Sequence, residues 1–182
     1  MSQATHDTAT STWTIDPAHT AVEFSVRHLM ITTVKGRFGT VSGTLVLDES
    51  SIERSKVEVE IDVNSIDTRE DKRDAHLRSA DFFDVENHPK LTFVSRRVER
   101  SGDGVKMTGD LTIRGTTKEI TLDVEDLGRA RDPWGGDRAA FTATGKLNRN
   151  EYGLKWNQAL ETGGVMVSDE VKLTIDAQFV RS

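Results

Sequence analysis

The sequence predicts an all-β domain in which eight antiparallel strands close into a barrel, with a short helical insert between the third and fourth strands. Hydrophobic and polar residues alternate with a period of two through most of the chain after Trp13. Such alternation is typical of antiparallel strands with one dry and one wet face. Turn-forming segments rich in glycine separate the alternating runs. Residues 64–84 do not alternate, so they hold the expected insert.

Each expected strand has one apolar face. In residues 20–28, Val22, Phe24 and Val26 share a face, and the residues between them are polar. The further strands are expected, in order, at 34–47, 56–64, 91–99, 105–113, 119–126, 138–148 and 171–179. The segments 101–104 and 131–137 are expected to reverse the chain, because their glycines permit positive φ.

The choice between a barrel and a two-sheet sandwich depends on how strongly the strands can coil. The second expected strand carries Gly36, Gly39 and Gly43, which permit sharp coiling and so favour the barrel. Eight strands enclose a space that is either filled by side chains or wide enough for one slender ligand. The alternation is the same in both cases, so the sequence leaves the two open.

The insert is expected to be a short helix followed by a helical turn that lies across one mouth of the barrel. Asp67, three residues before Glu70, and Ser79 are capping signals for these two turns. Phe82 and Phe83 are the expected apolar contacts of the insert, with at least one of them buried. Neighbouring residues on a helical turn point about 100° apart, so both cannot face the barrel equally.

Composition excludes several classes of function. The chain has 182 residues, a formal net charge of −6 and no cysteine. Disulfides and thiolate chemistry are excluded, and the negative charge disfavours nucleic acid and anionic membranes as partners. No apolar run reaches the roughly 18 residues of a transmembrane segment. Residues 1–12 are expected to form a disordered polar tail before a single domain at 13–182, and we read no signal peptide in them, so we expect a cytoplasmic protein.

Acidic residues and histidines gather in residues 74–93, which raises the question of a metal site. His76 and His88 do not stand at spacings with a strong metal signature, and capped helical turns with basic partners explain more of the stretch. We therefore favour a structural role and predict that this stretch binds no metal. His76 is expected in a hydrogen-bond network near the barrel mouth.

Other candidate polar and aromatic residues have a structural alternative. His28 is two residues after Val26, so it faces inward if the strand continues through it. If the strand ends before His28, its orientation is not fixed, and both alternatives stay open. The segment 16–19 (DPAH) is expected to be a turn rather than half of a catalytic pair. Trp134, Tyr152 and Trp156 are expected to close the barrel ends, with a binding rim as the alternative.

The chain resembles the YceI-like family of lipocalin-shaped, polyisoprenoid-binding proteins, from about Trp13 to the C-terminus. The motifs that carry the resemblance are WTIDPAHTAVEFSVRHL, KGRF, SIDTREDKRDAHLRSADFFDVENHPKLTF, MTGDLTIRGTTKEITLDV and LNRNEYGLKWNQALETGGVMVSDEVKL. The resemblance implies an elongated, lipocalin-like barrel whose interior accommodates a long isoprenoid tail. It brings no set of catalytic residues. Many relatives carry an export signal, which we do not expect in this chain.

Together these observations predict a protein that is not an enzyme and that binds, and carries or sequesters, a long-chain isoprenoid lipid of the quinone or polyprenol type. No cofactor is expected beyond this ligand or another apolar one, and the oligomeric state, a homodimer included, stays open. The alternative is a His/Asp enzyme acting on a small hydrophobic substrate at the barrel mouth. The residues predicted to line the tunnel are Val22, Phe24, Val26, His28, Phe38, Val57, Val59, Ile61, Phe93, Met107, Leu111, Ile113, Ile120, Leu122, Val124, Phe141, Trp156, Leu173 and Ile175.

Overall fold

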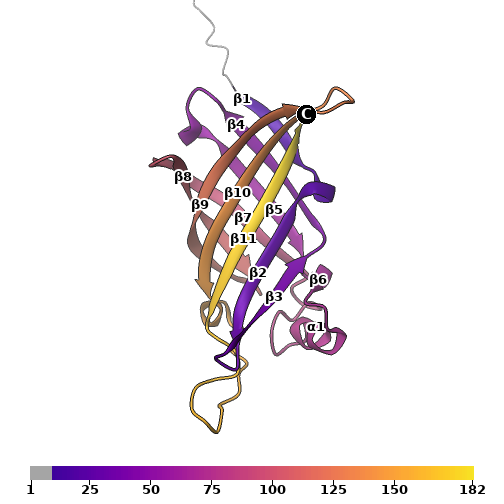
Figure 1. Ribbon diagram of the computed structural model, residues 1–182, viewed down its shortest axis with the longest axis vertical. Helices are drawn as coiled ribbons and strands as arrows, with labels where there is room; N and C mark the ends of the chain where they lie inside the picture. The colour runs from indigo at the N-terminus through magenta and orange to yellow at the C-terminus, as the bar shows by residue number, and fades with distance from the viewer. Residues whose placement is uncertain (1–9) are drawn as a thin grey trace, which may run out of the picture.

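The computed structural model describes residues 10–182, which form an elongated antiparallel barrel with one short helix beside its lower end (Figure 1). The strands are β1 (Thr10–Ile15), β2 (Ala21–His28), β3 (Thr32–Phe38), β4 (Val41–Asp48), β5 (Lys56–Asp62), β6 (Ile66–Asp67), β7 (Lys90–Ser101), β8 (Gly104–Ile113), β9 (Thr116–Arg131), β10 (Asp137–Asn148) and β11 (Glu170–Arg181). The helix is α1 (Asp71–Arg78). Among the described residues, no helix combines the length and the apolar character that a membrane span requires.

The barrel is closed by the pairing of β1 with β11, which joins the two ends of the strand order. The strands fall into eight positions around the barrel, because three pairs of short strands each share one position: β1 with β2, β3 with β4, and β5 with β6. β1 and β2 both pair with β11 and follow one another along it. β4 pairs with β1 and β3 pairs with β2, so β3 and β4 form the next position. The predicted eight-stranded antiparallel barrel is confirmed.

The first strand position begins earlier than the sequence predicts. β1 starts at Thr10, so the expectation that residues 10–12 belong to a disordered tail is wrong. The other residues of the predicted tail, 1–9, lie outside the described residues. The short strand β1 is held by ladders to both β4 and β11. A 3₁₀ turn (Pro17–His19) separates β1 from β2, where the Asp16 carboxylate accepts a hydrogen bond from the Ala18 amide. The predicted turn in this segment is therefore present.

The strand expected at 34–47 is interrupted between β3 and β4. Residues 39 and 40 lie outside both strands, and their amides donate to the carbonyl and hydroxyl oxygens of Ser65 instead of to a neighbouring strand. The interruption lets the two halves pair with different neighbours, β4 with β5 and β3 with β6. This bend allows one long segment to follow the curved wall of the barrel.

The helical insert lies between β6 and β7, where the sequence places it. Its N-cap is Glu70, whose carboxylate accepts from the amides of Lys72 and Arg73. Asp67 instead accepts from the Arg69 amide, so the expectation that Asp67 caps the helix is wrong. Ser79 opens the following turn, because its carbonyl accepts from the amides of Phe82 and Asp84. The helix thus ends by a turn that brings Phe82 into the core, where it is 6% exposed.

The two turn motifs near the upper end of the barrel meet at one arginine. Nη1 of Arg138 donates to Asp16 Oδ2 at 2.6 Å, and Nε donates to Asp132 Oδ2 at 2.9 Å. Hydrogen bonding from Arg138 holds the pKa of Asp16 below its usual value, and His19 adds to the effect. The Gly136 amide, followed by Arg138, lowers the pKa of Asp132. Arg138 therefore ties the chain before β2 to the β9–β10 hairpin.

Replacing Arg138 with glutamine is expected to lower the melting temperature at pH 7 by a few degrees at most, because the pairs are partly exposed. Carboxylates with a depressed folded-state pKa stabilise the protein above the unfolded pKa of about 4 and lose this effect as the pH falls through the folded value. The difference from wild type should therefore shrink below about pH 4. Thermal denaturation from pH 2 to 7 measures it. Arg131→Gln, which removes a largely exposed pair with Asp137, is the control, and a pH-independent difference for Arg138→Gln would contradict the assignment.

Candidate functional site

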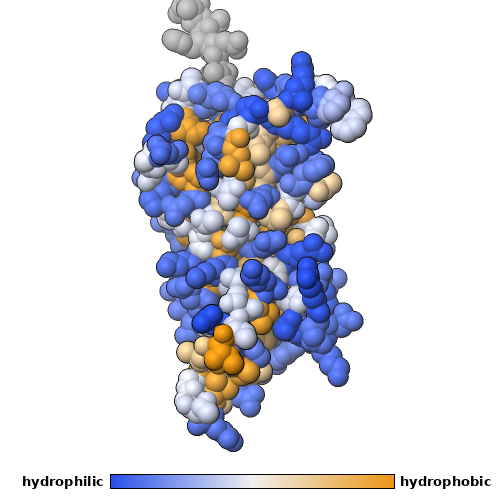
Figure 2. All heavy atoms as spheres, in the orientation of Figure 1, coloured by the Kyte–Doolittle hydropathy of each residue, from blue (hydrophilic) through white to orange (hydrophobic). Residues whose placement is uncertain are grey.

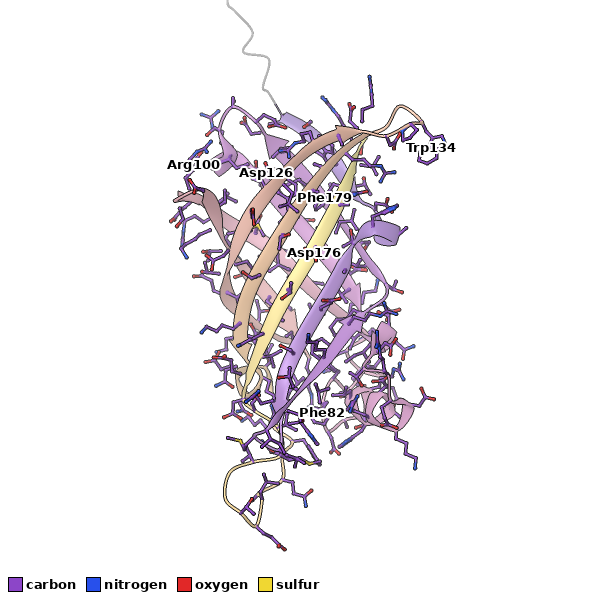
Figure 3. All side chains as sticks on the ribbon, in the orientation of Figure 1. Phe82, Arg100, Asp126, Trp134, Asp176 and Phe179 are labelled. Carbon is purple, nitrogen blue, oxygen red and sulfur yellow. The ribbon has the colours of Figure 1, made fainter. Side chains whose placement is uncertain are left out.

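The interior of the barrel holds two cavities that adjoin along its long axis. The upper chamber, about 380 Å³, lies among the strands from β1 to β11 and extends to Arg100 and Asp126, which Figure 3 labels at the upper end. The lower chamber, about 400 Å³, lies between the ends of β2, β10 and β11, the helix α1 and the loop at 153–169. Each is in the size range of pockets that enclose small organic ligands.

The two chambers meet at a ring of apolar side chains, here called the waist. Its members line both chambers: Phe24, Phe38, Leu91, Ile113, Leu147 and Leu173. The rings of Phe24 and Phe38 are 5.6 Å apart between centroids, and Phe83 contacts Phe38 edge-on at 6.0 Å. Because the same residues form a wall of each chamber, the chambers are parts of one apolar interior.

Every residue predicted to line the tunnel lies on a wall of one chamber or both. The residues that line only the upper chamber are Val22, Val57, Val59, Ile61, Phe93, Met107, Leu111, Ile120, Leu122, Val124, Phe141 and Ile175. The lower chamber alone takes Val26, His28 and Trp156. Phe24, Phe38, Ile113 and Leu173 belong to the waist. That these residues contact a ligand stays a prediction.

Sequence reasoning missed part of the upper wall. Ile15 of β1 and Val41, Leu45 and Leu47 of β4 also line the upper chamber. The alternation of 41, 43, 45 and 47 was the available signal for β4. In β1 the signal is weaker, because only Trp13 and Ile15 are apolar among threonine and serine.

The interior stays hollow partly because large side chains lie flat against the wall, over glycines of neighbouring strands. A Cβ at Gly36 would lie 2.3 Å from Cζ of Phe24, and one at Gly109 would lie 2.5 Å from Cζ of Phe93. Gly109 therefore leaves no free space in the interior, because the Phe93 ring occupies the place of its missing side chain. This packing still favours a cavity along the barrel axis, because a ring that lies against the wall does not extend to the axis.

A buried arginine holds the loop that covers the lower chamber. Arg149 is 4% exposed and donates to the carbonyl oxygens of Leu154, Trp156, Val167 and Ser168. Burial lowers the pKa of Arg149. By bonding to carbonyls from both ends of the loop, its guanidinium fixes segment 153–169 across the end of the barrel.

The β2–β3 turn forms the apolar part of the lower rim. Leu29 and Met30 have φ of 52° and 63°, a region that residues with bulky side chains rarely adopt. With Ile31 they are among the exposed large hydrophobic residues. The Leu29 amide donates to the Met166 carbonyl at 2.8 Å, which joins this turn to the loop at 153–169. Figure 2 shows a hydrophobic patch at this lower end, in addition to hydrophobic areas between polar side chains on the upper half of the same face.

His76 is part of a network on the wall of the lower chamber, as the sequence predicts. Its Nε2 lies 2.8 Å from Asp81 Oδ2, and its ring packs edge-on against Trp156 and Phe82 at 4.7 and 5.1 Å between centroids. His28 also lies on this wall, at the end of β2, so its inward parity is kept. The hydroxyl of Tyr152 is buried without a hydrogen-bond partner among residues 10–182, and burial raises its pKa to about 12.

The aromatic residues expected to close the barrel ends differ from one another. Tyr152 and Trp156 line the lower chamber, where they help to cover its end. Trp134 is 87% exposed and extends away from the barrel on the β9–β10 loop (Figure 3), so its expected role at a barrel end is wrong. The cause is the tight loop, in which Asp132 Oδ1 accepts from the amides of Trp134 and Gly136 and leaves the indole outside.

The described residues offer little support for metal chemistry. Within residues 10–182, no group of three or more histidine and acidic side chains is placed to hold a metal ion. The absence of metal from the stretch at 74–93 stays a prediction. Elemental analysis of dialysed protein would test it, and a stoichiometric metal lost in the double variant His76→Ala/His88→Ala would contradict it.

Comparisons with known proteins agree on one family. The model of the YceI-like domain matches residues 13–179. A UPF0312 protein of Staphylococcus aureus (strain USA300) is 41% identical over 168 residues, covering 92% of this chain and 96% of the relative. A crystal structure of a Campylobacter jejuni YCEI protein is 32% identical with a TM-score of 0.74, covering 100% of this chain and 99% of that one. A polyisoprenoid binding domain from Saccharophagus degradans shares the fold at 16% identity, with a TM-score of 0.67 and coverage of 93% and 98%.

Proposed function

The chain belongs to the YceI-like family, and from this premise we propose that its barrel binds, and carries or sequesters, a long-chain isoprenoid lipid without chemically changing it. The observation that carries the proposal is the apolar interior formed by two chambers that adjoin at the waist. The Saccharophagus degradans domain, named for polyisoprenoid binding, supports the ligand class through a shared fold. A quinone or a polyprenol is the type of lipid that the sequence predicts.

The physical basis of the proposed binding is the transfer of methyl and methylene groups from water to the chamber walls. Burial contributes about 0.8 kcal/mol for each methylene, so ten enclosed methylenes contribute roughly 8 kcal/mol. Loss of ligand freedom and ordering of side chains offset about several kcal/mol of this. A prenyl tail long enough to occupy both chambers therefore has sufficient binding energy without a strong polar contact.

The proposal is tested by extraction and by a ligand series. Mass spectrometry of a solvent extract of purified protein should reveal a lipid with a long apolar tail. In titrations with prenyl alcohols of increasing length, affinity should rise at least about tenfold for each isoprene unit at short lengths, then level off when the interior is full. Affinity that is independent of tail length would contradict the proposal.

The alternative of a His/Asp enzyme rests on His76, which lies on the wall of the lower chamber and pairs with Asp81 outside that wall. Carrier and enzyme differ in what happens to the ligand. A carrier should return the bound lipid unchanged after prolonged incubation, and time-dependent formation of a product that His76→Ala abolishes would favour the enzyme. The cytoplasmic location stays a prediction from the sequence alone, and fractionation of the native cells would test it.

A further inference from the structure

A cluster of three charged side chains, Glu49, Asp126 and Arg129, spans the upper end of the barrel interior. Nε of Arg129 donates to Glu49 Oε1 at 2.9 Å, and Nη1 and Nη2 donate to the two carboxylate oxygens of Asp126 at 2.7 and 3.1 Å. Glu49 directly follows β4, whereas Asp126 and Arg129 belong to β9. Going around the barrel, β4 and β9 are separated by β5, β7 and β8 in one direction and by β1, β11 and β10 in the other. The bond between Arg129 and Glu49 therefore joins opposite walls of the barrel.

The register of the strands explains why Asp126 and Arg129 both point inward. Arg129 is opposite Ala139 in the β9–β10 ladder, and Asp126 is opposite Phe141. Directly paired residues share a face of the sheet, and Ala139 is 1% exposed while Phe141 lines the upper chamber. Residues three apart in a regular strand would face opposite sides, but the ladder has an irregularity between Ala140 and Phe141 that restores the inward direction.

The cluster lies at the boundary between the upper chamber and the solvent. Glu49 continues the inward parity of Leu47 in β4, and Glu49 and Asp126 both line the chamber. The guanidinium of Arg129 lies 5.2 Å from the centroid of the Phe141 ring, which is another part of the chamber wall. The side chain of Arg129 is 28% exposed and that of Glu49 is 56% exposed, so the cluster contacts the chamber on one side and water on the other.

The two ends of the barrel are covered to different degrees. At the lower end, the buried Arg149 holds the loop at 153–169 by bonds to backbone carbonyls, and Phe82 of the insert is part of the core. At the upper end, the chamber wall includes Arg100, Gly102 and Asp103 of the β7–β8 hairpin, and all three are exposed to solvent. The upper end is therefore the end with less structure to displace when a ligand passes.

Resting on the proposed function, we propose that the ligand enters and leaves through the upper end of the barrel, and that the bond between Arg129 and Glu49 is a gate across this path. The ladder of β9 with β8 ends at Val124, and beyond it β9 pairs with β10 alone among the strands of residues 10–182. This part of β9 can move away from the loop after β4 with little loss of backbone hydrogen bonding. A partly exposed ion pair and a cation–π contact hold the gate, and both are weak enough to break and re-form.

The first test measures how fast labelled geranylgeraniol, preloaded into the full chain, is released into an excess of the unlabelled alcohol. Arg129→Gln and Glu49→Gln should each speed release by about threefold or more at low salt, with affinity within a few-fold of wild type because entry is faster as well. High salt should speed release from the wild type and narrow this difference. Asp126→Asn changes only a contact within β9 and should have a smaller effect. Arg131→Gln, which removes an exposed pair with Asp137 off the chamber wall, should have none.

The second test closes the gate covalently. The chain has no cysteine, so a short bis-maleimide can join the two thiols of the double variant Glu49→Cys/Arg129→Cys specifically. Release should be faster than from the wild type before cross-linking and at least about tenfold slower than from the wild type afterwards, because the two walls can no longer separate. Lys106→Cys/Asp123→Cys replaces an exposed ion pair of the β8–β9 ladder. Cross-linked in the same way, it is the control and should release the alcohol at the wild-type rate.

The outcomes separate the gate from the proposed function. Release at the wild-type rate from the cross-linked Glu49→Cys/Arg129→Cys protein, or equal slowing in the cross-linked control, would overturn the gate while leaving binding in the interior intact. Equal release rates for Arg129→Gln and Arg131→Gln would overturn it as well. Failure of geranylgeraniol to bind the folded wild-type protein would instead refute the proposed function.

Discussion

Replacing Phe82 with alanine should lower the free energy of unfolding by about 3–5 kcal/mol, the range measured when large buried aromatic side chains are truncated. Phe82 is 6% exposed, and its ring packs against Trp156 at 5.5 Å and against His76 at 5.1 Å between centroids. Its removal would leave a cavity between the helical insert and the loop at 153–169. Denaturant titration at constant pH measures the change.

Phe83 supplies the matched comparison. It is only partly buried and contacts Phe38 at the waist, so Phe83→Ala should cost about 1–3 kcal/mol, less than its neighbour. The sequence predicts that at least one of the two is buried, and the structure confirms this for Phe82. Two effects well below about 1 kcal/mol would mean that the insert is not packed against the barrel as described.

The strands were predictable because their signal is local. Apolar residues at a period of two are enough to identify the strands that form the barrel wall. The same pattern identifies which side chains of each strand face inward. The strand β1 was not predicted, because threonine and serine occupy most of its positions and obscure the alternation of apolar and polar residues. Its ladders to β4 and β11 also involve residues that are far away in sequence. Long-range pairing of this kind has no local trace.

The parts of the site outside the strands were less predictable. The loop at 153–169 has no period, and its position depends on Arg149, whose bonds to backbone carbonyls cannot be inferred from residue types. Trp134 was misplaced because exposure depends on how far a hairpin extends beyond the barrel. The hollow interior depends on register, since Phe24 lies flat only because Gly36 is its partner across the strands.

Replacing Leu173 with tryptophan should divide the interior at the waist and so separate long ligands from short ones. Leu173 lies on both chamber walls, opposite Phe24 in the β2–β11 ladder and opposite Gly145 in the β10–β11 ladder. A larger side chain here has the axis of the barrel to fill, so the loss of stability should stay within the roughly 1–3 kcal/mol of an overpacked core.

Tails that need both chambers should lose about 100-fold or more in affinity to Leu173→Trp, because about half of their buried methylenes would return to water. Tails short enough for one chamber should bind within a few-fold of wild type. Thr174→Trp is the control, since the next residue of β11 is exposed on the outer face. Titration of prenyl alcohols of several lengths against the three proteins measures the effect. A uniform loss at all lengths would indicate general damage to the barrel, and full retention of long-tail affinity would mean that the tail does not cross the waist, so that each chamber binds a ligand of its own.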